Sequence, residues 1–125
     1  MAKIPCEYEE ETKFINISVK WFVRSLIFYR KGNLVIFHYT GDITGATTNI
    51  PAGAISIAPA GTIPEKYRPA SSQTIYTISP TDGVSITLST DGSISGYNYT
   101  GGVITNTRSN RFQDLPYFTS ATAES

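Results

Sequence analysis

Residues 84–89 alternate strictly between apolar and hydroxyl-bearing side chains, and this alternation constrains the fold more than any other feature. In an extended chain, successive side chains point to opposite faces, so one face of this segment is apolar and the other is polar. The dipeptide Asp91–Gly92 follows, and it is typical of a tight hairpin turn. Residues 93–100 then read SISGYNYT, which places Tyr97 and Tyr99 on one face. The sequence therefore predicts an antiparallel hairpin with one buried face.

Segments of this kind recur about every ten residues, with turn residues between them. They cover residues 14–19, 25–30, 34–40, 54–58, 73–79, 84–90, 93–100 and 103–107. The spacing predicts an all-β fold, namely an antiparallel β-sandwich that is jelly-roll-like. We expect one domain over residues 13–120, a flexible or docking segment over residues 1–12, and a frayed C-terminus over residues 121–125.

The segment LVIFHYT, residues 34–40, carries apolar side chains on both of its faces. Val35, Phe37 and Tyr39 share one face, while Ile36 and His38 lie on the other. This pattern predicts a strand in the centre of the sandwich or against a neighbouring subunit. Two polar stretches, residues 41–53 and 108–114, are expected to be loops.

Charge and motif content exclude several classes of function. The chain has ten basic and ten acidic residues, which gives no general reason to bind nucleic acid. It has no apolar run of the ~18 residues that a membrane span needs and no signal peptide, so we expect no membrane insertion. One cysteine and one histidine, Cys6 and His38, predict neither a disulfide framework nor a metal site. No cofactor or catalytic motif is present, so the chain is predicted not to be an enzyme.

Binding is therefore the better category, because aromatic rings and short polar side chains on a β-scaffold suit flat, polar ligands such as sugars. The candidate ligand-binding residues are His38, Asp42, Tyr97, Tyr99, Arg111 and Asp114. For the two tyrosines, packing at a sheet or subunit interface is the alternative. For His38 the alternative is an interior or interface histidine, and for Arg111 and Asp114 it is a solvated loop. A calcium ion held by carboxylates also stays open.

The segment GTIPEKYRPAS, residues 61–71, fits neither a strand nor a helix. Pro64 and Pro69 fix φ near −65° and push the residues before them into extended conformations. Tyr67 is expected to pack its ring beneath the segment, and Arg68 to donate hydrogen bonds to loop carbonyls or a carboxylate. We interpret this arm as a stiff, structural connector that crosses from one sheet to the other.

Three motifs in order carry a resemblance to a known family. They are YRKGNLV at residues 29–35, IPEKYRP at residues 63–69 and DGSI at residues 91–94. Over about residues 21–104, this series resembles the C-terminal head domains of bacteriophage tail-fibre and receptor-binding proteins. One departure is Lys66, which stands where the family pattern usually has glycine. If that position needs positive φ, lysine is strained there.

The resemblance implies a homotrimer at the tip of a fibre, carried in the virion and made in the host cytoplasm without a signal peptide. It also implies a non-enzymatic head that recognises a host cell-surface saccharide. The alternative is a structural baseplate or tail-fibre component that binds other virion proteins, with the acidic residues near the N-terminus as the docking segment. A carbohydrate-active enzyme or free lectin is a third hypothesis, in which Asp42 or Asp114 would be needed for turnover.

Overall fold

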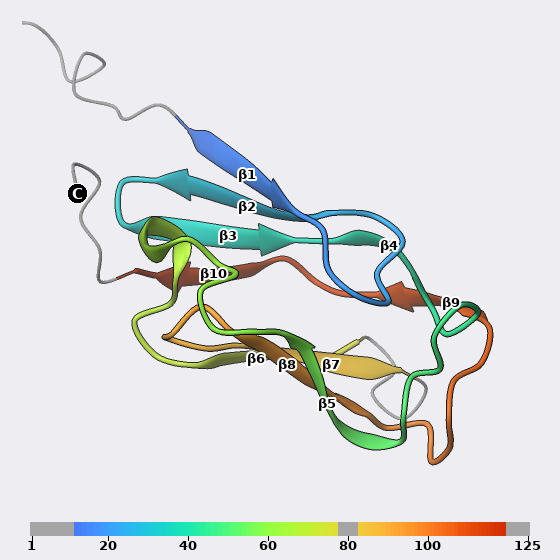
Figure 1. Ribbon diagram of the computed structural model, residues 1–125. Coiled ribbons are helices and arrows are strands. Elements are labelled where there is room, and N and C mark those ends of the chain that lie inside the picture. The colour runs from blue at the N-terminus through green and yellow to red at the C-terminus, as the bar shows by residue number, and fades with distance from the viewer. Residues whose placement is uncertain (1–11, 78–82, 120–125) are drawn as a thin grey trace, which may run out of the picture.

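The computed structural model describes residues 12–77 and 83–119, and these form two stacked four-stranded antiparallel sheets and a separate two-stranded sheet (Figure 1). The first sheet has the order β1 (Lys13–Ile17), β2 (Leu26–Lys31), β3 (Leu34–His38) and β10 (Leu115–Phe118). The second has the order β5 (Gly53–Ala58), β8 (Ile94–Asn98), β7 (Val84–Leu88) and β6 (Gln73–Ile75). The predicted all-β antiparallel architecture is confirmed. No helix among these residues is long and apolar enough to cross a membrane.

The core lies between the facing sides of the two sheets. From the first sheet it takes aromatic side chains such as Phe28 and Phe37, whose rings meet edge to face at 5.3 Å. From the second sheet it takes the apolar side of the alternation over residues 84–88. Burial of these side chains supplies the main driving force for folding, at roughly 25 cal/mol per Å² of apolar surface.

The hairpin of β2 and β3 forms where the sequence predicts it, with the two-residue turn Gly32–Asn33 between the strands. Gly32 has φ of 62°, a conformation that tight hairpin turns require and that glycine adopts without strain. Strand β3 shows the expected two-sided character. Val35 and Phe37 are fully buried, while Ile36 is half-buried on the outer face.

The prediction of loops at residues 41–53 and 108–114 is wrong in part, because strands β4 (Thr40–Thr44) and β9 (Thr107–Arg111) lie there. They pair with each other in antiparallel register, with Asp42 opposite Ser109. Ile43 is the only strongly apolar residue of β4, and it is fully buried. A polar strand with one buried apolar residue lacks the alternation that identifies strands in a sequence. The predicted turn at residues 80–83 lies largely outside the described residues.

The arm contains a single turn of 3-10 helix, Glu65–Tyr67, between the extended residues Pro64 and Arg68. The expected strain at Lys66 is absent, since Trp21 is the only described non-glycine residue with positive φ. The prediction that the arm crosses from one sheet to the other is also wrong. It joins β5 to β6, which are the two edges of the same sheet, and it contacts the other sheet on the way.

The three motifs of the family resemblance meet at this arm. The amide of Ile63 donates to the carbonyl of Gly92 in the Asp91–Gly92 turn at 2.9 Å, and Arg68 Nε donates to the carbonyl of Ile63 at 2.7 Å. From the first sheet, the guanidinium of Arg30 donates to the carbonyl of Lys66. We call this set of contacts the arm interlock. It fastens the arm to both sheets.

Tyr117 of β10 also holds the arm, because its hydroxyl donates to the carbonyl of Tyr67 at 2.5 Å. Burial raises the pKa of Tyr117 and that of Tyr39 above the ordinary tyrosine value of 10.0. Both phenols therefore stay neutral in the folded protein at pH values where an unfolded chain would ionise them. Their contribution to stability is complete below about pH 10 and is lost as the pH rises above it.

We predict that the free energy of unfolding changes little between about pH 7 and pH 9 and falls steeply above about pH 10. The Tyr117→Phe variant should be less stable near neutral pH, because it loses the bond to Tyr67, yet it should lose less stability at alkaline pH. Urea unfolding at several pH values, followed by circular dichroism, measures both effects. If the Tyr117→Phe variant loses as much stability at alkaline pH as the wild type does, burial of the Tyr117 hydroxyl does not cause the pH dependence.

Candidate functional site

The structure places the six candidate residues in three separate locations. Asp42 and Arg111 line one pocket. His38 and Asp114 are bonded to each other near the outer face of the first sheet. Tyr97 and Tyr99 lie together on the outer face of the second sheet.

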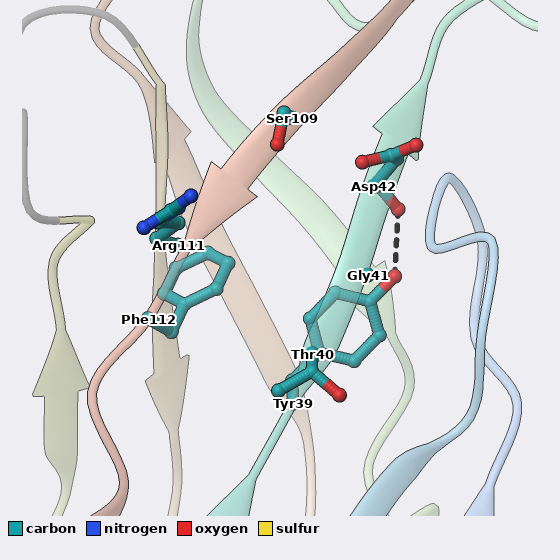
Figure 2. Close-up of a pocket in the computed structure, with 7 residues that line it drawn as sticks. All are labelled: Tyr39, Thr40, Gly41, Asp42, Ser109, Arg111 and Phe112. Atoms are coloured by element: carbon teal, nitrogen blue, oxygen red, sulfur yellow. Dashed lines mark hydrogen bonds between the residues drawn. The ribbon is translucent and has the colours of Figure 1, made fainter.

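The pocket has a volume of about 410 Å³, opens to the solvent, and is lined by residues of the paired strands β4 and β9 and of the segments beside them. We call it the β4–β9 pocket, and its lining residues are Tyr39, Thr40, Gly41, Asp42, Ser109, Arg111 and Phe112 (Figure 2). Two cross-strand pairs form its polar part, with Thr40 opposite Arg111 and Asp42 opposite Ser109. Paired residues of an antiparallel ladder share a face, so the pairing itself brings the carboxylate and the guanidinium to one site.

Two buried aromatic rings form the apolar part of the pocket. Tyr39 and Phe112 are 2% and 8% exposed, and their rings meet at 65° with centroids 6.3 Å apart. The hydroxyl of Tyr39 donates to the backbone carbonyl of Asp42 at 2.6 Å, which ties the ring to the strand that carries the carboxylate. Burial raises the pKa of Tyr39, so this donor stays protonated near neutral pH.

Gly41 is required by this packing. A Cβ atom at Gly41 would lie 2.8 Å from the Tyr39 hydroxyl oxygen, closer than real contacts allow. Any larger residue would push the ring away from the position in which it donates to Asp42. The wall of the pocket is therefore fixed by a glycine between two of its polar residues.

The chemistry of the pocket is that of a small polar ligand with an apolar face. The Asp42 carboxylate accepts hydrogen bonds, the Arg111 guanidinium donates them, and Thr40 and Ser109 do both. Figure 2 shows Arg111 and Phe112 on the β9 side of the pocket, and Asp42 and Tyr39 on the β4 side. A mainly apolar concavity with a few convergent polar groups is the usual form of a ligand site.

His38 and Asp114 contact each other through Nδ1 and Oδ1 at 2.6 Å. Their side chains are 28% and 57% exposed, so the pair is accessible. Neither residue lines the β4–β9 pocket. The structure thus separates Asp114 from Asp42, and it gives His38 a partner across strands β3 and β10.

Tyr97, Tyr99 and a third residue, Tyr76, form an exposed tyrosine cluster. The ring of Tyr99 lies 4.5 Å from that of Tyr97 and 6.0 Å from that of Tyr76, and all three side chains are between 38% and 51% exposed. Strand residues that share this outer face carry hydroxyl groups, with Ser56, Thr74, Thr87 and Ser95 reaching the surface and Ser85 buried. The cluster is thus an aromatic platform on a hydroxyl-rich surface.

Asn98 shows that part of the tyrosine-rich segment is structural. It is 2% exposed, and its amide nitrogen donates to the carbonyls of Pro51 and Gly102 at 3.0 and 2.9 Å. Its amide oxygen accepts from the backbone of Thr100 at 3.0 Å. Asn98 therefore holds two loops in place, and the adjacent tyrosines project from a fixed backbone.

Sequence reasoning missed Tyr76 and most of the lining of the pocket. For Tyr76 a signal exists, because it takes an outward position in the alternation that follows β6. For Tyr39 and Phe112, the pattern indicates core residues, which they are, and gives no sign that they also form a pocket. Nothing local in the sequence predicts that residues 40–44 pair with residues 107–111.

No protein-family model matches the chain, and no curated protein is similar to it in sequence. The class that the structure defines is an all-β antiparallel sandwich with a pocket at one end and a tyrosine cluster on one face.

Proposed function

We propose that this protein is a non-enzymatic, phage-type receptor-binding head that recognises a saccharide of the bacterial cell surface in the β4–β9 pocket. The observation that carries the proposal is that Asp42, Ser109 and Arg111 line one pocket together with the aromatic residues Tyr39 and Phe112. Saccharides combine apolar ring faces with many hydroxyl groups. A carboxylate and a guanidinium supply the acceptors and donors for those hydroxyls, and the small exposed parts of the Tyr39 and Phe112 rings supply a limited apolar contact.

The arm interlock supports the resemblance to phage heads, because it gives the three shared motifs a common structural role. They contact one another at the end of the sandwich that bears the β2–β3 hairpin, opposite β4 and β9 (Figure 1). The motifs thus secure the scaffold, while the pocket lies at the other end. Such a separation between scaffold and ligand site is expected because proteins that share one fold can carry different binding sites on it.

The tyrosine cluster is a second contact for the same polymer in this proposal. Its rings are exposed and its neighbours carry hydroxyl groups, which suits an extended saccharide that passes over the surface. In the proposed homotrimer at a fibre tip of the virion, three copies of each site act together. Weak binding at each site then becomes strong binding by avidity.

The pocket is tested by the variants Asp42→Asn and Arg111→Gln. Each removes one charged hydrogen-bonding group without removing the side chain, so each should weaken binding by about tenfold or more. The probe is purified cell-wall polysaccharide from a panel of bacteria, and the measurement is isothermal titration calorimetry. Glu65→Gln is the matched control, because it removes an exposed carboxylate from the opposite end of the sandwich and should leave binding unchanged.

If the wild type binds a polysaccharide and both pocket variants bind it equally well, the ligand lies elsewhere. Tyr97→Ala then asks whether the tyrosine cluster is the principal site. Release of reducing ends from the polysaccharide would contradict the non-enzymatic assignment.

A structural role in a baseplate or tail fibre is the second candidate, and the observation that favours it is an exposed apolar face on the first sheet, which suits a protein contact. A wild-type protein that binds purified tail proteins, but neither polysaccharide nor cells, would support this alternative over the receptor-binding role.

A further inference from the structure

We infer that copies of this chain pack against one another through the outer face of the first sheet. The proposed function enters only as the source of the expected number of copies, and the surface itself is argued from the structure. We call this surface the apolar face. It consists of Phe14, Ile27, Tyr29, Leu34, Ile36, Pro116 and Phe118.

The register of the sheet places these residues in adjoining rows. Phe14 of β1 lies opposite Tyr29 of β2, which lies opposite Ile36 of β3, which lies opposite Pro116 of β10. The next row contains Leu34 opposite Phe118. The apolar side chains thus form one continuous area across all four strands, since cross-strand neighbours on one face are in contact range.

These residues are accessible in the single chain. Phe118 and Phe14 are 70% and 60% exposed, the highest values among the large hydrophobic residues that the structure describes. An antiparallel sheet that covers a core usually has a polar outer face, and outside the tyrosine cluster the second sheet follows this rule with its serines and threonines. The first sheet does not follow it. Extended apolar surface of this kind marks a protein interface.

The charges around the apolar face favour a second copy as the partner. Lys31 lies in the row of Leu34 and Phe118, while Asp114 lies beside His38 at the opposite end of the sheet. A partner surface that carries only positive or only negative charge would place a like charge against either Lys31 or Asp114. A second copy of this chain presents the same Lys31 and the same Asp114–His38 pair at the two ends of its own apolar face, so that opposite charges can be brought together.

The segments that directly flank the described residues 12 and 119 are poor alternatives by composition. Residues 7–11 contain four glutamates, and covering the face with them would bring carboxylates against apolar side chains, which is unfavourable. Residues 120–125 contain only serine, threonine, alanine and one glutamate, so they have no large apolar side chain to bury.

Light scattering after size-exclusion chromatography tests the inference with the intact protein. We expect the wild type to have a mass that is a multiple of 13.6 kDa, three times that value if the proposed trimer is correct. The double variant Phe14→Ser/Phe118→Ser should dissociate to the mass of one chain, or raise the dissociation constant by about 100-fold or more. Because both side chains are largely exposed in the single chain, circular dichroism should show an unchanged fold.

The matched control is Val23→Ser/Val103→Ser, which removes two apolar side chains of similar exposure, 57% and 55%, from outside the apolar face. It should keep the mass of the wild type. A photo-reactive phenylalanine analogue at position 118 should yield covalent dimers on illumination, and one at position 103 should not. This second measurement needs no destabilising change, so it holds even if the double serine variant unfolds.

A wild type of 13.6 kDa at the highest soluble concentration would overturn the inference, as would a double variant that keeps the wild-type mass. Failure here is distinct from failure of the proposed function. A monomeric protein that still binds polysaccharide through Asp42 and Arg111 would leave the pocket assignment intact. An oligomer that binds no polysaccharide would support the inference about the apolar face and contradict the proposal that the protein recognises a saccharide.

Discussion

Replacing Arg30 with methionine should lower the free energy of unfolding by about 3 kcal/mol or more. Arg30 is 5% exposed, and its guanidinium donates to the carbonyl of Gly32 at 2.7 Å and to that of Lys66. Hydrogen bonds from a charged donor contribute more than neutral ones, and their removal leaves part-buried carbonyls without this donor. Methionine fills similar space but donates nothing, so the loss reports on the hydrogen bonds.

Chemical denaturation followed by fluorescence measures this effect. Arg24→Met is the matched control, because Arg24 is exposed on the same sandwich and its replacement should change stability by less than about 0.5 kcal/mol. If the Arg30 variant is as stable as this control, the arm interlock does not depend on the guanidinium. The Arg30→Lys variant should recover only part of the loss, because an ammonium lacks the fork that reaches both carbonyls.

Gly92→Ala should be destabilising by about 3 kcal/mol, from two causes that act at the same position. Gly92 has φ of 84°, which disfavours any residue with a Cβ atom. A Cβ atom there would also lie 2.7 Å from the carbonyl oxygen of Ile63 and 2.7 Å from Nε of Arg68. The alanine would therefore separate the Asp91–Gly92 turn from the arm.

Gly101→Ala distinguishes these two causes. Gly101 has nearly the same φ, 83°, but a Cβ atom there would meet nothing within 4 Å. Its replacement should be destabilising by about 1 kcal/mol, the backbone contribution alone. Thermal unfolding of both variants gives the difference, which measures the close contact between turn and arm. Equal losses in the two variants would show that the arm can move away without penalty.

These stability variants and the pocket variants act at opposite ends of the sandwich. Gly92→Ala and Arg30→Met should weaken the scaffold and, where the protein stays folded, leave the affinity of the β4–β9 pocket unchanged. Asp42→Asn and Arg111→Gln should do the reverse, because both side chains face the pocket and neither lies in the core. Variants of the two groups therefore distinguish residues that stabilise the fold from residues that are proposed to bind the saccharide.

The sequence by itself determined the fold class and several local elements. The alternation over residues 84–88 predicted the strand β7 and its buried apolar side chains, although Ser85 on the other face is buried as well. The hairpin of β2 and β3 formed with glycine in the conformation that its turn requires. The two prolines and Arg68 produced a stiff arm. These features depend on side-chain periodicity and backbone preference over a few neighbouring residues, so they can be predicted from the sequence alone.

Only the tertiary structure decided where the candidate residues meet. It paired Asp42 with Ser109, joined His38 to Asp114, and added Tyr76 to the two expected tyrosines. It also showed that the arm joins the two edges of one sheet, and that the outer face of the first sheet is apolar across four strands. Each of these contacts joins strands that are distant in sequence. Their pairing depends on how the whole core packs and on which loops can close, and no short stretch of sequence contains that information.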